Sequence, residues 1–224
     1  MFQSINEESI AEIIEKKSKF IASLYEANSK EEAENILQET RKKYHDAKHN
    51  CYAYIVNENK DKEVIGNFKD NNIAVNDIQE IEKCSDDGEP SGTAGAPLLA
   101  LLKSSNLTNV IIIVTRYFGG ILLGTGGLVR AYTEVAQKAI NNAKIVQKDY
   151  GIRYEIQINY SNLKEIQYIC KKLNINIVGT EYKENINLYI ESTVDSRKKI
   201  EKEKIKILRI KDIESKIIEI SKIW

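Results

Sequence analysis

The sequence is poor in the residues that mark several whole classes of protein. Its three cysteines, Cys51, Cys84 and Cys170, are odd in number and include no C-x-x-C pair, so neither a disulfide framework nor a thiolate zinc site is indicated. No apolar run approaches the ~20 residues that span a bilayer, and no charged-then-apolar leader follows Met1. We therefore expect a cytoplasmic globular protein that does not interact with a membrane.

An excess of charge of either sign is also missing. Lysine plus arginine equal aspartate plus glutamate at 33 each, so no global field draws the chain towards nucleic acid or repels it. Any nucleic-acid binding must therefore come from a local patch. With 224 residues the chain is long enough for one large domain or two small ones.

Glycine and proline are scarce except in one part of the chain. Eight of the eleven glycines and both prolines fall between Gly88 and Gly127. Glycine admits positive φ and close approach of other atoms, and proline fixes φ, so this clustering marks shaped loops. We call Ser85–Pro97 the first glycine loop and Phe118–Gly127 the second, and we expect any site to lie there.

The N-terminal region shows a hairpin, a helix and a buried strand. Weak alternation over Phe20–Leu24 predicts a strand that follows a turn at Lys16–Ser18, while Ile10–Ile14 fits a strand or a helix. A capping box formed by Ser29 and Glu32 predicts a helix that runs to about Tyr44. Two further segments follow: a strand over Cys51–Val56 and a polar hairpin or surface insertion over Asn57–Asn76.

The two glycine loops are separated by a short helix and a strand. Pro97 suits the first turn of a helix, and the continuous apolar run Val110–Val114 predicts a central strand covered on both faces. A long helix follows the second loop, with Arg130, Glu134 and Lys138 pointing outward. Its expected buried stripe consists of Leu128, Tyr132, Val135, Ala136, Ala139 and Ile140.

A second domain is predicted to begin near Asp149, which divides the chain into residues 1–148 and 149–224. Strand and helix patterns alternate there as β-α-β-β-α, most of a ferredoxin-like unit. Ser161 and Asp195 are the expected helix caps, and the tail fits a strand, a helix or both. The expected segments are strands at 151–160, 176–182 and 186–192 and a helix through Leu173. The chain is therefore expected to be an α+β protein.

The second glycine loop joins a buried strand to a helix, an arrangement that points backbone N–H groups at a phosphate or carboxylate. Gly119–Thr125 approaches a Walker loop but lacks its lysine, and the Rossmann pattern fails at Val129. Either anion binding or close packing of helix and strand explains the glycines. The candidate residues are Gly120, Gly124, Thr125, Gly126 and Gly127, with Thr125 and Gly126 as the expected cap.

The first glycine loop carries an acidic cluster of Asp86, Asp87 and Glu89 beside the hydroxyls of Ser91 and Thr93. Such a cluster is suited to magnesium, to acid and base chemistry or to basic groups of a partner. It is equally typical of a turn, because aspartates bond their own backbone. No choice between these interpretations follows from the sequence.

Two arginines flank the second glycine loop. Arg116 and Arg130, with Tyr117 and Phe118, would make a small phosphate-binding and stacking surface. Alternatively, Arg116 pairs with one of the two aspartates and locks the loops together. Arg116 and Arg130 are therefore candidates for binding an anion or a partner.

Evidence for a metal or a nucleophile is missing. His45 and His49 would share a helical face if the helix continued that far, but H-D-A-K-H lacks the glutamate of H-E-x-x-H. No G-x-S-x-G elbow is present, and Cys51 near His49 or Cys84 near Asp86 is too loose a pairing to indicate an activated thiol. We expect no metal, no cofactor and no catalytic residue.

Four ordered motifs resemble the YigZ/Impact family. The sequence runs are KKSKFIA from Lys16, DAKHNCYAY from Asp46, SDDGEPSGTAGAP from Ser85 and VTRYFGGILLGTGGLVRAY from Val114. They fall within residues 1–148, and the remaining chain resembles the smaller C-terminal domain of the bacterial YigZ branch. The resemblance implies an N-terminal domain like the fourth domain of elongation factor G and a ribosomal protein, followed by a ferredoxin-like domain.

The resemblance also implies a function in translation. Eukaryotic Impact proteins regulate translational control, so the expected partner is the ribosome, RNA or a translation-related protein, and the family supplies no catalytic residues. The competing hypothesis is an enzyme or sensor for a phosphorylated or nucleotide-like small molecule. In that case Gly124–Gly127 would hold the anion, and Asp86 or Asp87 would position a metal or a proton.

Overall fold

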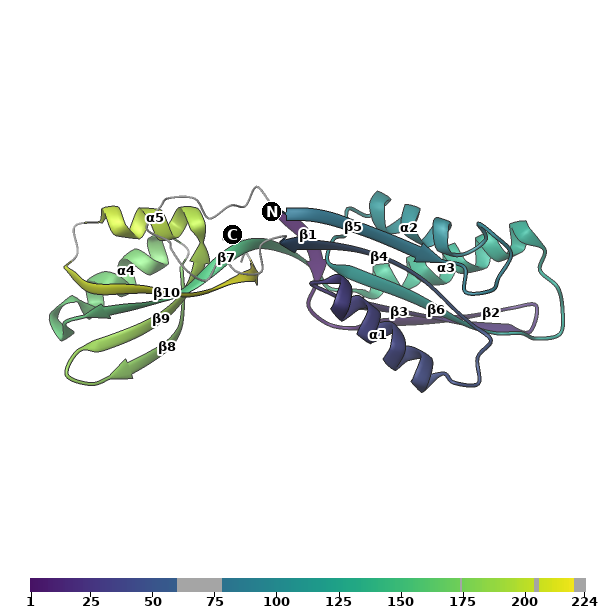
Figure 1. The fold of residues 1–224 in the computed structure, drawn as a ribbon, viewed down its shortest axis with the longest axis horizontal. Coiled ribbons are helices and arrows are strands. Elements are labelled where there is room, and N and C mark those ends of the chain that lie inside the picture. The colour runs from purple at the N-terminus through teal and green to yellow at the C-terminus, as the bar shows by residue number, and fades with distance from the viewer. Residues whose placement is uncertain (60–77, 174, 204–205, 220–224) are drawn as a thin grey trace. The chain divides into compact units, whose positions relative to one another are not determined.

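The chain forms two compact units. The computed structural model describes residues 1–59, 78–173, 175–203 and 206–219. One unit comprises the described residues of Phe2–Lys60 and Ile78–Val146, and the other comprises Met1 and the described residues from Gln147 onward (Figure 1). The polar stretch predicted as a hairpin or insertion lies outside the described residues, apart from its first three residues, which end a strand.

The N-terminal unit contains a five-stranded antiparallel sheet in the order β2-β3-β6-β4-β5. The strands of this sheet are β2 (Ser9–Glu15), β3 (Ser18–Glu26), β4 (His49–Asn59), β5 (Ile78–Ser85) and β6 (Val110–Tyr117), and a further strand of the unit, β1 (Phe2–Ile5), lies outside it. Its helices are α1 (Lys30–Lys43), α2 (Gly95–Ser104) and α3 (Thr125–Asn142). The mixture of helices and antiparallel sheet confirms the predicted α+β class.

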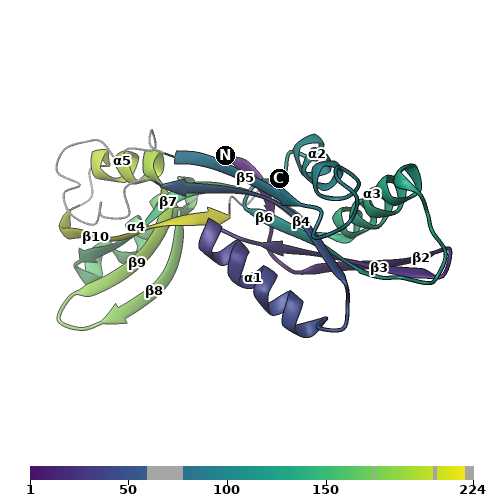
Figure 2. The same ribbon diagram turned by 45° about the vertical axis from the view of Figure 1, so that its right-hand side comes forward.

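The continuous apolar sequence of β6 is explained by its position in the centre of the sheet, where both of its faces are buried. Val110, Ile112 and Val114 face the core formed with α2 and α3, while Ile111 and Ile113 face the smaller core under α1. Figure 1 and Figure 2 show α1 on one face of the sheet and α2 and α3 on the other. Alternate residues of β6 are therefore buried on both faces, as the apolar run predicts.

Local turn chemistry sets the ends of β2, β3 and α1. Lys16 and Lys17 have φ of 46° and 66°, as a tight hairpin turn requires, so the predicted turn is confirmed and Ile10–Ile14 belongs to a strand. Ser29 caps α1, its Oγ accepting from the Glu32 N–H at 3.1 Å. The reciprocal bond of the capping box differs, because the Glu32 carboxylate accepts from Asn28.

The buried face of α3 matches the predicted stripe, with Ala131 added to the buried residues. The helix begins one residue after its cap, which is Gly124 rather than the predicted Thr125 or Gly126. Gly124 has φ of 71°, a conformation that favours glycine, and the helical backbone therefore starts only at Thr125.

The C-terminal unit has the element order β7-α4-β8-β9-α5-β10, with a 3₁₀ turn at Tyr160–Asn162. Strand β10 pairs with β7, β7 with β9 and β9 with β8, all antiparallel, which is the ferredoxin-like arrangement. The bounds are β7 (Ile145–Ile158), α4 (Leu163–Lys172), β8 (Asn176–Tyr182), β9 (Ile186–Thr193), α5 (Val194–Lys202) and β10 (Ile207–Glu219).

Both predicted helix caps of this unit were wrong. Asn162 precedes α4 because Ser161 lies inside the 3₁₀ turn, and Thr193 caps α5 by accepting from the Ser196 N–H at 3.2 Å. Asp195 lies in the first helical turn instead. The described part of the tail is strand β10. Among the residues with a described structure, no helix has the length and apolarity needed to cross a membrane.

Candidate functional site

Asp86 organises the first glycine loop from inside. Its Oδ2 accepts from the Gly92 N–H at 2.8 Å, and its Oδ1 accepts from the N–H groups of Ala94 and Gly95 at 2.9 and 2.8 Å. Burial by itself would raise the pKa of Asp86, but these three donors outweigh it and hold the pKa below its usual value. The carboxylate therefore stays ionised and is used to shape the loop.

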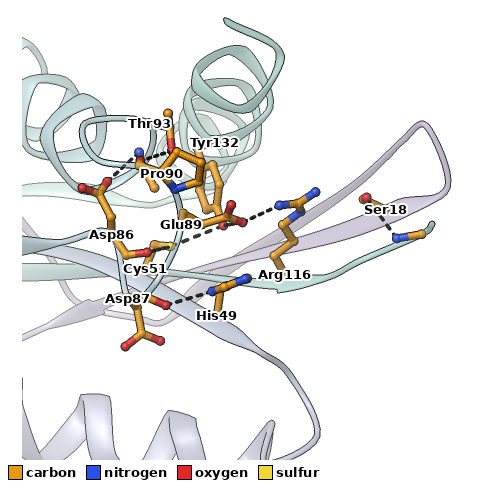
Figure 3. A network of polar contacts seen from close by, with 12 residues as sticks. Ser18, His49, Cys51, Asp86, Asp87, Glu89, Pro90, Thr93, Arg116 and Tyr132 are labelled. Atoms are coloured by element: carbon orange, nitrogen blue, oxygen red, sulfur yellow. Dashed lines mark hydrogen bonds and ion pairs between the residues drawn. The ribbon is translucent and has the colours of Figure 1, made fainter. Parts of the chain in front are cut away.

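Asp87 fastens the same loop to the sheet and to α1. Its Oδ1 forms an ion pair with Arg41 at 2.6 Å, and its Oδ2 accepts from the Asn50 N–H at 2.7 Å. The ring Nδ1 of His49 donates to the Asp87 carbonyl at 2.8 Å (Figure 3). His45 and His49 share no helical face, since α1 ends at Lys43 and His49 opens β4.

A buried ion pair joins the first glycine loop to the end of β6, just before the second loop. Arg116 Nη1 lies 2.5 Å from Glu89 Oε1, and the side chains are 7% and 3% exposed. The hydroxyl of Tyr132 on α3 donates to the same oxygen at 2.9 Å (Figure 3). The Arg116 guanidinium also lies over the rings of Phe20 and Phe118, at 5.4 and 5.5 Å from their centroids.

This ion pair corrects the expectation that Arg116 pairs with one of the two aspartates. Arg116 pairs with Glu89 of the first loop and with neither aspartate, and its guanidinium lies over the Phe118 ring of the second loop. Because Arg116 is buried, it belongs to the wall between the loops, whereas Arg130 lies exposed on α3. The two arginines therefore do not form the exposed phosphate surface that their positions in the sequence suggested.

Cys51 lies behind the ion pair and is not an activated nucleophile. Its Sγ is 2.9 Å from the Asp86 carbonyl oxygen and 3.3 Å from the Tyr132 hydroxyl. Burial raises the pKa of the Cys51 thiol to about 12, with smaller contributions from nearby carboxylates. At neutral pH the group is therefore a protonated thiol that fills the core.

The second glycine loop packs against the β2–β3 hairpin. The Gly119 N–H donates to Ser18 Oγ at 3.1 Å (Figure 3). A Cβ added at Gly119 would lie 2.0 Å from the Lys17 carbonyl carbon, so only glycine fits this contact. Gly120 and Gly124 have φ of 84° and 71°. Packing and backbone conformation thus explain these glycines without a ligand.

At Gly126, neither close packing nor backbone conformation requires a glycine. Its φ is outside the left-handed region, and a Cβ added there would meet no atom within 4 Å. Its neighbour Gly127 differs, because a Cβ there would lie 3.0 Å from the Leu123 Cβ. Glycine in a helix costs about 0.5–1 kcal/mol of stability relative to alanine. Nothing within the described residues explains why Gly126 is retained at this cost.

A cleft of about 420 Å³ lies between the two loops and is the candidate site. It brings together four of the residues predicted from the sequence, namely Glu89, Arg116, Gly124 and Thr125. The others, Asp86, Asp87, Ser91, Gly120, Gly126, Gly127 and Arg130, do not line it.

Sequence reasoning missed the apolar and basic lining of this cleft. Lys48 and His49 contribute from the residue before β4 and its first residue, and Leu122 and Leu123 contribute from the second loop beside Phe118, which the sequence had suggested as a stacking residue. Leu122 is 82% exposed and Phe118 51%. The signal was available, because the letters I-L-L between Gly120 and Gly124 place large aliphatic side chains in a turn, where they have little to pack against.

The described residues contain no group of three or more histidine, cysteine or acidic side chains placed to hold a metal ion. What the cleft offers is apolar surface, a basic rim and the first turn of α3. Gly124 has no side chain with which to cap that turn, and the first N–H groups of a helix have no acceptor within it. Such a site is suited to recognition of a partner.

Comparison with known proteins agrees with the motifs. The family model for the Impact N-terminal domain matches residues 16–140, and a domain of unknown function (DUF1949) matches residues 156–202. The chain is 34% identical to the IMPACT family member YvyE of Bacillus subtilis over 182 residues, 80% of this chain and 75% of that protein.

It is also 34% identical to the IMPACT family member YigZ of Escherichia coli over 167 residues, 75% of this chain and 74% of that protein. A crystal structure of a hypothetical protein, 28% identical, superimposes with a TM-score of 0.57 and covers 95% of this chain and 97% of the other. The chain therefore belongs to the Impact family.

Proposed function

We propose that this protein is a cytoplasmic, non-catalytic regulator that binds a protein component of the translation machinery through the surface around the second glycine loop. Membership of the Impact family supports the link to translation, because the resemblance implies translational control. The observation that carries the binding role is the exposure of Phe118, Ile121 and Leu122 at 51%, 42% and 82%. Exposed aromatic and aliphatic side chains in one loop are typical of protein interfaces.

The acidic cluster supports binding over catalysis. Asp86 and Asp87 each accept hydrogen bonds that hold the first loop in place, and Glu89 is buried in its pair with Arg116. A general acid or a metal ligand needs an oxygen that can reach the substrate or the ion. The enzyme hypothesis depends on Asp86 or Asp87, and the geometry gives it no support.

Co-sedimentation of the full chain with ribosomes tests the proposal. Leu122→Asp is expected to abolish association, because it places a charge in the centre of the apolar contact. The matched control is Tyr168→Asp, which places the same charge at a site 69% exposed on α4 of the other unit and should leave association unchanged. Equal binding by both variants would contradict the assignment to this surface.

A salt series separates a protein contact from an RNA contact. A contact through 6–10 phosphates loses about 10³–10⁵ in affinity between about 50 and 200 mM salt, whereas an apolar protein contact loses little. We expect the association to persist across this range. A loss on the scale of phosphate contacts would show that RNA is the ribosomal component bound, and no association at any salt would contradict the link to ribosomes.

A further inference from the structure

The cleft between the glycine loops has the dimensions and lining of a specific binding site. Its volume of about 420 Å³ falls in the range of about 300–1,000 Å³ typical of ligand pockets. Pro90, Phe118, Leu122 and Leu123 supply apolar walls. An aromatic or aliphatic side chain of a partner would fill this space and displace poorly held water.

The polar part of the lining is complementary to an anion. Lys48 stands exposed at the rim, beside His49, and Gly124 and Thr125 bring the start of α3 to the cleft. The positive end of the helix dipole and unpaired N–H groups favour a negative charge at that point. Glu89 also lines the cleft, but its charge is compensated by Arg116.

Arg116 supplies an independent sign that the site is incomplete as it stands. Its side chain is 7% exposed and lines the cleft, yet its Nε has no hydrogen-bond partner among the described residues. A buried guanidinium N–H without an acceptor is costly, so an acceptor brought by a partner would relieve the cost.

We propose that the cleft binds a segment of a protein partner in which an acidic side chain stands next to an aromatic or aliphatic one. The apolar side chain enters between Phe118, Leu122 and Pro90, and the carboxylate lies at the first turn of α3 within reach of Lys48. A protein segment is favoured over RNA because nucleic-acid interfaces are polar, whereas most of this lining is apolar. The inference rests on the proposed function and adds the chemistry of the recognised segment.

Selection of random twelve-residue peptides displayed on phage, with the full chain as the target, tests the inference without knowledge of the partner. We expect enrichment of sequences that carry Asp or Glu within two positions of Leu, Ile, Phe or Trp. Synthetic versions of the enriched peptides should bind Lys48→Glu about tenfold more weakly than the native protein, because one charge pair is reversed. Replacing the acidic residue of the peptide by its amide should weaken binding to a similar extent.

Lys144→Glu is the matched control, since it makes the same charge change at an exposed lysine that does not line the cleft. Equal weakening by both lysine variants would show that only net charge matters and would overturn the inference. So would the absence of any enriched sequence, enrichment of basic peptides, or stronger competition by a twelve-nucleotide single-stranded RNA than by the peptides.

The inference and the proposed function fail in different ways. If the native protein selects acidic and apolar peptides but never sediments with ribosomes, the cleft has the stated chemistry and the link to translation is wrong. If it sediments with ribosomes and Lys48→Glu sediments equally well while Leu122→Asp does not, the partner contacts the apolar side chains only, and the recognition of an acidic side chain is wrong. Backbone amide shifts at Thr125 and Gly126 on adding peptide provide a second readout of the same contact.

Discussion

The two glycine loops line one cleft and use their residues in opposite ways. In the first loop the carboxylates turn inward, where Asp86 accepts three backbone N–H groups and Glu89 is paired with Arg116. In the second loop Phe118 and Leu122 turn outward, and the start of α3 is left without a side-chain cap from Gly124. The charged loop therefore maintains the structure, and the uncharged one is available for recognition.

The largest expected effect comes from breaking the ion pair between Glu89 of the first loop and Arg116 of β6. Arg116→Met should lower the free energy of unfolding by about 3–5 kcal/mol, because it leaves Glu89 as an uncompensated buried charge. Urea unfolding followed by far-ultraviolet circular dichroism measures the loss. The double variant with Glu89→Gln should recover part of it. A cost below about 1 kcal/mol for the single variant would show that the loops hold together without the pair.

Removing the Asp86 carboxylate should have the next largest effect. Asp86→Ala leaves three backbone N–H groups without their acceptor and should cost on the order of 3 kcal/mol. The control is Ser91→Ala, at an exposed residue of the same loop, which should change the free energy of unfolding by less than about 0.5 kcal/mol. If the two variants are equally stable, the first loop does not depend on its charges and the contrast between the loops is lost.

The Asp86 effect should also depend on pH. Its pKa in the folded protein is lower than that of an ordinary aspartate, about 3.9, so the charged carboxylate stabilises the fold fully above that pH. The contribution disappears as the pH falls through the folded pKa. The unfolding free energies of the native protein and of Asp86→Ala should therefore converge as the pH falls below the ordinary aspartate pKa of about 3.9. A constant difference down to pH 2 would mean that the charge contributes nothing.

Much of the fold was predictable because its signals are local. The turn at Lys16, the cap at Ser29 and the doubly buried run Val110–Val114 each depend on a few neighbouring residues. The predicted caps at Ser161 and Asp195 were wrong, because in each case a neighbouring residue occupies the N-cap position instead. The 3₁₀ turn that includes Ser161 places Asn162 at the N-cap of α4. At α5, the Thr193 hydroxyl accepts the hydrogen bond from the Ser196 N–H.

The site was less predictable because its contacts join residues far apart in the sequence and depend on side-chain length and strand register. The sequence suggested that Arg116 pairs with an aspartate of the first loop. Asp86 has a short side chain, which reaches only the N–H groups of its own loop, while the longer Glu89 extends to Arg116. The cleft lining by Lys48 depends on the register of β4 with β6, in which His49 lies opposite Arg116. Sequence spacing contains no such information.

A smaller effect is expected where the second loop meets the hairpin. Gly119→Ala places a Cβ 2.0 Å from the Lys17 backbone, so the loop or the hairpin must move. We expect a loss of about 2 kcal/mol in unfolding free energy, typical of overpacking. Weakened peptide binding should accompany it, because Phe118 is displaced. An alanine tolerated at no cost would show that the second loop is not anchored and that its exposed side chains are not held in place.

The smallest effect, and the one of opposite sign, is expected at Gly126. Alanine there has ordinary φ and meets no atom within 4 Å, so Gly126→Ala should raise the free energy of unfolding by about 0.5–1 kcal/mol through better helix propensity. Gln137→Ala, farther along the outer side of α3, is the control for a change within the same helix. Urea unfolding gives the stability of both variants, and co-sedimentation with ribosomes gives their binding.

A Gly126→Ala variant that is more stable and binds less would show that this glycine leaves space for a partner against the first turn of α3. A variant that is more stable and binds normally would confine recognition to Leu122 and its neighbours. A destabilised variant would mean that the helix start needs glycine for its own conformation, and then the second loop, like the first, would be explained by structure alone.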